Sequence, residues 1–125
     1  MGRAFLGLMA AVFIPYGIYC LVSPDMLADG AGITALNTTG TIELQAMYGG
    51  LQVGVGALCL LGVFRKHLEQ AALYALLFIF AGLAVVRVGL GLTQGDFSGY
   101  TVFAMSFETA GLLFLYWYLL FRKPA

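Results

Sequence analysis

Four long apolar stretches, separated by short polar connections, decide what this chain can fold into. They cover residues 5–22, 43–64, 71–93 and 100–121. Each is close to the roughly 20 residues that a helix needs to cross a bilayer core about 30 Å thick. Only 10% of the residues are charged and 62% are hydrophobic, whereas a soluble domain usually carries about 25% charged residues. The sequence therefore predicts an all-α integral membrane protein.

The connections between these stretches predict the order of the helices. Residues 65–70 and 94–99 are too short for anything but a turn, and 23–42 is rich in Gly, Asp and Pro, with room for one interfacial helical turn. Short connections join antiparallel neighbours. We expect one transmembrane domain over residues 1–125, folded as an up-down four-helix bundle.

Basic residues predict the orientation of the bundle. With the N-terminus in the cytoplasm, every basic residue outside a span falls on a cytoplasmic flank, and the two outer connections contain no Lys or Arg: the six are Arg3, Arg65, Lys66, Arg87, Arg122 and Lys123. Positive charge concentrates on the cytoplasmic side of membrane proteins. An N-in, C-in topology is the prediction.

Arg87 lies inside the apolar stretch 73–92, where a cation is costly and usually has a partner in the protein interior. At about 1.5 Å per residue, Arg87 lies roughly 9 Å from the outer end of the third span, and Glu108 roughly 12 Å from that of the fourth. Their side chains are within reach in height. If the two helices are neighbours, we expect an ion pair.

Polar side chains of the first two spans lie at similar heights and are candidates for the same cluster: Tyr16, Glu43, Tyr48 and Gln52. Gln52 shares a helix face with Gln45, whereas Glu43 projects elsewhere, so Glu43 and Gln52 are not expected to meet Arg87 together. Two interpretations stay open. The cluster is a structural clamp that fixes helix register, or it lines an outward-opening pocket for a polar head group, a quinone, a small ion or protons.

Glycines within the spans predict close helix packing, because small residues let membrane helices approach each other. The second span carries Gly50 and Gly54 four residues apart, with Gly49 on an adjacent face, and the third carries Gly82 and Gly89 seven apart.

Several kinds of chemistry are not expected. The single histidine, His67, has no Cys or carboxylate pair around it in the sequence, so no metal or haem site is predicted. Cys20 and Cys59 fall at opposite ends of their helices, too far apart for a disulfide. No phosphate-binding loop or catalytic motif appears, and a net charge of zero argues against nucleic-acid binding. We expect no catalytic residue and no cofactor.

The stretch Glu-Leu-Gln-Ala-Met-Tyr-Gly-Gly-Leu-Gln-Val-Gly at 43–54, followed by Arg87 and Glu108, resembles a family of small bacterial four-helix membrane proteins of unknown function, distantly similar to DoxX-type bundles. The resemblance implies a multi-pass protein of the bacterial inner membrane. It implies a shared core of Glu43, Tyr48, Gly49, Gly50, Arg87 and Glu108, and no particular activity.

The predicted function is that of a non-enzymatic accessory or small-ligand-binding subunit, with membrane lipid as a partner, lipid or quinone as candidate ligands, and a homo-oligomer or larger complex as its setting. One alternative is a homo-oligomeric transporter or channel in which Glu43 or Glu108 is an ion-coupled carboxylate. A second is a lipid- or quinone-directed membrane enzyme with Tyr16 or Tyr48 as proton donor.

Overall fold

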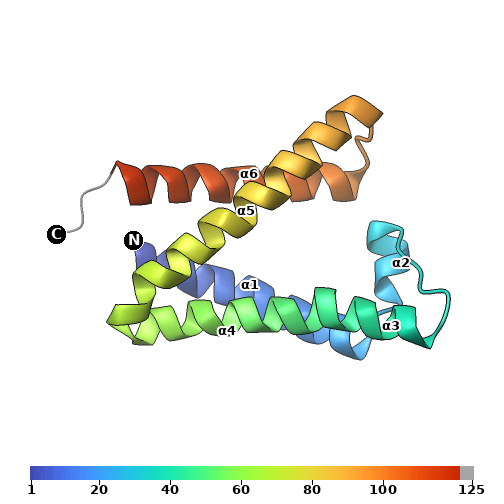
Figure 1. Ribbon diagram of the computed structural model, residues 1–125, viewed down its shortest axis with the longest axis horizontal. Coiled ribbons are helices and arrows are strands. Elements are labelled where there is room, and N and C mark those ends of the chain that lie inside the picture. Colours follow the sequence, from blue (N-terminus) through green and yellow to red (C-terminus); the bar gives the residue numbers. More distant parts are fainter. Residues whose placement is uncertain (122–125) are drawn as a thin grey trace. The chain divides into compact units, whose positions relative to one another are not determined.

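The computed structural model describes residues 1–121, and this part of the chain is almost entirely helical (Figure 1). Four continuous helical segments are long and apolar enough to cross a membrane: Gly2–Val22, Thr38–Phe64, Lys66–Gln94 and Gly99–Leu120. The predicted fold class, an all-helical membrane protein with four spans, is confirmed. The protein is a multi-pass membrane protein.

The helices extend beyond the apolar stretches that predicted them. The second begins at Thr38, because the Oδ1 atom of Asn37 accepts a hydrogen bond from the N–H of Gly40 at 2.9 Å and caps it. The connection expected at 65–70 shrinks to Arg65 alone, whose extended backbone separates two helices. Hydropathy marks where side chains meet lipid, whereas the backbone hydrogen bonds of a helix continue into its polar flanks.

The chain forms two compact units, and the first comprises Met1–Glu69. In it α1 (Gly2–Val22) runs antiparallel to a long helix made of α3 (Thr38–Leu44), η1 (Gln45–Gly50) and α4 (Leu51–Phe64) (Figure 1). A Cβ placed on Gly17 would lie 2.8 Å from the carbonyl oxygen of Gly49, and one on Gly7 would lie 3.9 Å from Val63. The two helix backbones thus approach closely at Gly17 and Gly49, where small residues leave room for such contact.

The connection from α1 to α3 contains a short helix, α2 (Met26–Ala31). A helical turn was expected in this connection, and α2 is that turn. Its Leu27 is fully buried. Gly32 ends it with a φ of 71°, a left-handed conformation that glycine adopts without steric cost. The amide of Gln45 also ties this region together, because its Nε2 donates to the carbonyl oxygen of Leu21 at 2.9 Å.

Two departures from regular α-helical hydrogen bonding lie within unit 1. Pro15 sits inside α1 and supplies no backbone N–H. Residues Gln45–Gly50 form the π-helix η1, a wider turn with i→i+5 bonding. This π-helix coincides with the middle of the 43–54 motif.

The second unit begins at Gln70 and consists of the remainder of α5 (Lys66–Gln94) and of α6 (Gly99–Leu120), which run antiparallel. A Cβ on Gly111 would lie 2.6 Å from the ring of Phe80, so the ring occupies the space that this glycine leaves. Phe80 also meets Phe107 edge-on, with ring centroids 5.7 Å apart. These contacts set the spacing of α5 and α6. They lie within one to two helical turns of Arg87 and Glu108, on the side away from the α5–α6 turn.

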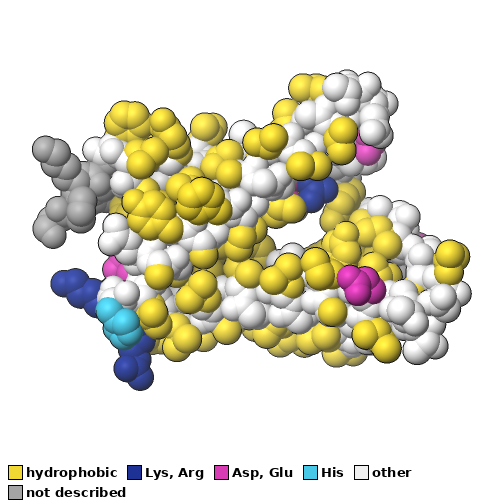
Figure 2. Space-filling model, viewed as in Figure 1, with side chains coloured by type: hydrophobic (Ala, Val, Ile, Leu, Met, Phe, Trp, Pro, Cys, Tyr) yellow, Lys and Arg dark blue, Asp and Glu magenta, His cyan; other side chains and the backbone are white. Residues whose placement is uncertain are grey.

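Apolar side chains are spread over the face shown in Figure 2, and charged side chains occupy few places on it. Large exposed hydrophobic residues occur on each of the four spanning helices; those on α5 and α6 include Phe78, Val85, Leu92, Phe103 and Leu113. In a bilayer these side chains meet lipid.

Candidate functional site

The turn between α5 and α6 is built by a short run of residues with turn chemistry. Gly95, with a φ of 69°, ends α5, and the N–H of Asp96 donates to the carbonyl oxygen of Gly91 at 2.9 Å. This is the bonding pattern of a glycine-terminated helix. Ser98 then caps α6, because its Oγ accepts from the N–H of Thr101 at 3.4 Å.

Asp96 connects the end of α5 to the start of α6 through hydrogen bonds. Its Oδ1 accepts from the N–H of Ser98 at 3.1 Å, and its Oδ2 accepts from the hydroxyl of Thr101 at 2.8 Å. The backbone bond from Ser98, followed by the bond from Thr101, holds the pKa of the Asp96 carboxyl below its ordinary value. Asp96 is therefore ionised at neutral pH.

Arg87 and Glu108 form a two-point ion pair between α5 and α6. Nε of Arg87 donates to Oε1 of Glu108 at 2.7 Å, and Nη2 donates to Oε2 at 3.1 Å. The Glu108 side chain is only 8% exposed, whereas that of Arg87 is 28% exposed. The carboxylate is thus covered, while the Arg87 side chain as a whole is partly exposed. The ion pair expected from helical depth is present.

Tyr100 adds a second contact from α6 to the same guanidinium. The Arg87 Cζ atom lies 5.9 Å from the centre of the Tyr100 ring, within the range of a cation–π interaction. Glu108 and Tyr100 are two turns apart on α6, and together they fix where the Arg87 head group sits.

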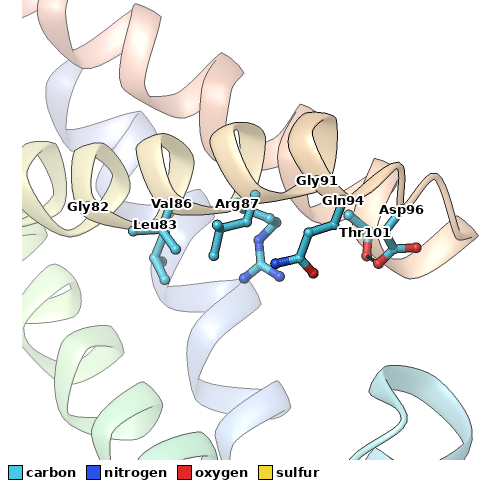
Figure 3. Close-up of a pocket in the computed structure, with 9 residues that line it drawn as sticks. Gly82, Leu83, Val86, Arg87, Gly91, Gln94, Asp96 and Thr101 are labelled. Carbon is cyan, nitrogen blue, oxygen red and sulfur yellow. Dashed lines mark hydrogen bonds between the residues drawn. The ribbon is translucent and has the colours of Figure 1, made fainter.

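An open pocket of about 430 Å³ lies beside this cation. Figure 3 shows Arg87 and Gln94 extending from the same side of α5, with Asp96 and Thr101 joined at the end of the helix. The wall is otherwise apolar, and the whole lining comes from unit 2: Gly82, Leu83, Val86, Arg87, Leu90, Gly91, Gln94, Asp96 and Thr101. A pocket with apolar walls and a few fixed polar groups is the usual form of a small-molecule site.

Residues 1–119 match the family described as Domain of unknown function (DUF4345). The chain belongs to this family. No curated protein and no solved structure matches the chain. The expected membership of a family of unknown function is confirmed.

The remaining polar candidates of this DUF4345 chain all lie in unit 1. Glu43 is exposed on α3, Tyr48 is half-buried in η1, Gln52 is half-buried in α4, and Tyr16 is half-buried in α1. The structure brings Arg87 together with Glu108 and Tyr100. A shared cluster with the four residues of unit 1 stays a prediction.

The glycines differ in what surrounds them. Gly49 is buried, and a Cβ there would lie 2.6 Å from Leu21 Cγ. A Cβ on Gly50 would meet only the carbonyl oxygen of Gln45, at 4.0 Å. A Cβ on the other three would meet no described atom of its own unit within 4 Å: Gly54, Gly82 and Gly89. A packing role for these four glycines stays a prediction.

Sequence reasoning did not identify Gln94, Asp96 and Thr101 as site residues. The signal was present in the spacing, because Asp, Ser and Thr at 96, 98 and 101 match an aspartate turn that leads into a helix cap. Among residues 1–121, no group of three or more His, Cys, Asp and Glu side chains could hold a metal ion.

Proposed function

We propose that this protein binds a small amphipathic molecule in the α5–α6 pocket and serves as a non-enzymatic ligand-binding or accessory subunit in the membrane. The observation that carries the proposal is the position of Arg87. Arg87 lines an open pocket of about 430 Å³, and its head group also contacts Glu108 and Tyr100. A fixed cation beside apolar walls suits a molecule with a polar head and an apolar body.

Two features favour binding over a purely structural clamp. A clamp requires only that the two charges meet, whereas Arg87 also faces a pocket and remains 28% exposed. Leu83, Val86 and Leu90 line that pocket and are themselves exposed. Together they place a polar contact and an apolar surface on the same side of α5.

The geometry of Glu108 supports this function over ion-coupled transport. A coupling carboxylate has to exchange its bound ion or proton, whereas Glu108 is covered and accepts two hydrogen bonds from Arg87.

We further propose an N-in, C-in orientation in a bacterial inner membrane, which puts the α5–α6 turn on the outer side. Support comes from unit 1, where Nε of Arg3 donates to Glu69 at 3.2 Å and so brings the N-terminus to the level of Arg65 and Lys66. Basic side chains gather there in Figure 2. Arg122 and Lys123 lie outside the described residues. Reporter fusions after Glu69 and after Gly95 test this orientation.

Native mass spectrometry of the protein purified in mild detergent tests the binding function. We expect a retained small molecule that disappears in the double variant Arg87→Met/Glu108→Met, which removes both charges together. Arg3→Met/Glu69→Met is the matched control, because it removes the other described ion pair and leaves the pocket intact. A wild-type protein that retains nothing, or a ligand that both double variants retain equally, contradicts the proposal.

A further inference from the structure

The two charged residues that line the α5–α6 pocket are both engaged within the protein. The guanidinium of Arg87 donates two hydrogen bonds to Glu108, contacts the ring of Tyr100 and has a further interaction within the protein. Each carboxylate oxygen of Asp96 accepts a hydrogen bond from the α5–α6 turn. Neither charge therefore needs a ligand to complete its surroundings.

The side-chain amide of Gln94 is not engaged in this way. Gln94 is exposed and lines the pocket, and no hydrogen bond joins its amide to any residue in the range 1–121. Figure 3 shows the side chain turned back along α5 toward Arg87, which places the amide among the pocket residues. An amide offers two donors and one acceptor oxygen. The pocket thus presents one polar group whose donors and acceptor are both available to a ligand.

An apolar strip of α5 leads from Gln94 toward the middle of the membrane. Leu83, Leu90 and Gln94 follow one another at spacings of seven and four residues, which puts them on one face of the helix. Leu83 and Leu90 line the pocket together with Val86, and all three are exposed. From Gln94 to Leu83 the strip is about 16 Å long at 1.5 Å per residue. A molecule held at Gln94 therefore has a continuous apolar surface for its hydrocarbon part.

The length of α5 places the Gln94 amide in the membrane interface. α5 has 29 residues, so it is about 43 Å long, and a centred helix extends about 6 Å beyond each side of a 30 Å core. Gln94 is the last residue of α5. Because helical side chains lean toward the N-terminal end of their helix, its amide lies closer to the core than its Cα does. This is the interfacial region, where the polar ends of membrane lipids lie.

The charges beside the pocket disfavour a ligand that carries a net charge. Arg87 is the one cation in the described part of unit 2, and two carboxylates, Glu108 and Asp96, stand near it. An anion therefore meets an excess of negative charge. A cation gains little, because Asp96 is exposed and a solvent-exposed ion pair is weak. An uncharged head group that forms hydrogen bonds avoids both disadvantages.

We propose, resting on the binding function above, that the ligand is an uncharged acylglycerol with a free hydroxyl group. Its hydroxyl donates to Oε1 of Gln94, and Nε2 of Gln94 donates to its ester carbonyl. Its hydrocarbon lies along Leu90, Val86 and Leu83, which are exposed on the pocket side of α5. A quinone matches this amide less well, because quinone carbonyls only accept hydrogen bonds and leave the acceptor of Gln94 unused.

Titration of the delipidated protein with lipids of identical acyl chains tests this assignment, with native mass spectrometry as the readout. Diacylglycerol is expected to bind about two- to tenfold more tightly than its O-acetylated derivative, which keeps the ester carbonyls and loses the hydroxyl donor; this is the range of one net hydrogen bond. Phosphatidic acid, which carries a phosphate at the same position, is expected to bind more weakly than diacylglycerol. Titration of monoacylglycerol beside diacylglycerol distinguishes the two sources of this head group.

Gln94→Leu is expected to bring the ratio of diacylglycerol to its O-acetylated form close to one. Gln70→Leu, which replaces an exposed glutamine near the other end of α5, is the matched control and should leave the ratio unchanged. Equal binding of the two lipids by the wild type overturns the assignment without any variant, and so does tighter binding of phosphatidic acid. Retention of a quinone or a charged lipid refutes this inference and leaves the binding function standing, whereas a protein that retains and binds nothing refutes both.

Discussion

Replacement of Glu108 by Met should destabilise the α5–α6 pair by about 2 kcal/mol. Complete removal of one partner from a buried ion pair costs about 3 to 5 kcal/mol, and polar contacts between membrane helices are worth about 0.6 to 2 kcal/mol. The two bonds, at 2.7 and 3.1 Å, are well formed, but Arg87 is 28% exposed and can turn toward water. The loss therefore falls at the upper end of the membrane range.

Removal of both charges should cost less than removal of one. Arg87→Met/Glu108→Met replaces the pair with two apolar side chains of similar length, and we expect it to lie within about 1 kcal/mol of the wild type, since no orphaned charge remains. Unfolding by SDS in mixed micelles, followed by circular dichroism, gives the four free energies of a double-mutant cycle. A double variant whose loss equals the sum of the single losses would show that the two side chains do not stabilise each other, and the reasoning fails.

Three further predictions concern other parts of the chain. Gly17→Ala places a Cβ 2.8 Å from a backbone oxygen and should destabilise unit 1 by about 1 to 3 kcal/mol in the same SDS assay. Gly54→Ala, with open space around the new Cβ, should change stability by less than about 1 kcal/mol. Equal effects of the two substitutions contradict the close packing at Gly17. Gly111→Ala should cost about 1 kcal/mol or more, because the new methyl meets the Phe80 ring; no change in SDS unfolding would show that the ring moves aside freely. Because the folded pKa of Asp96 is lowered, its contribution to the turn is complete above the ordinary carboxyl range and is lost as the pH falls through the folded pKa. The protection of amides at the start of α6, measured against the intrinsic exchange rate at each pH, should therefore fall with acid in the wild type, and Asp96→Asn should remove that loss of protection.

The sequence predicted the parts of this structure that depend on composition and helical rise. Apolar length located four spans, and counting along two of them placed Arg87 and Glu108 at heights where their side chains meet. Both inferences use properties of a single helix. They need no knowledge of how neighbouring helices rotate.

What the sequence did not predict depends on backbone hydrogen bonding and on rotation about the helix axis. The second spanning helix begins at Thr38, earlier than predicted, because of one capping hydrogen bond to the side chain of Asn37. The π-helix at 45–50 is a change in backbone hydrogen bonding, which a hydropathy pattern does not report. Which glycine faces a neighbour also follows from rotation, so Gly17 and Gly111 were not singled out although both meet another helix tightly. An outward-opening pocket at Arg87 was one of the two interpretations left open, but its residues at the α5–α6 turn, Gln94, Asp96 and Thr101, were not identified because their place depends on the hydrogen bonds of that turn.

The regular α-helical hydrogen bonding is interrupted in both long helices of unit 1, at about the same height along the pair. Pro15 withholds an amide hydrogen from α1 just before the close contact at Gly17, and η1 lies directly across from that contact. Inside lipid, water does not replace a missing backbone hydrogen bond, so bending concentrates where the regular α-helical bonding is interrupted. Unit 1 is therefore expected to bend at this level. The amide hydrogens of residues 45–50 should exchange faster than those of α4 on either side of Cys59.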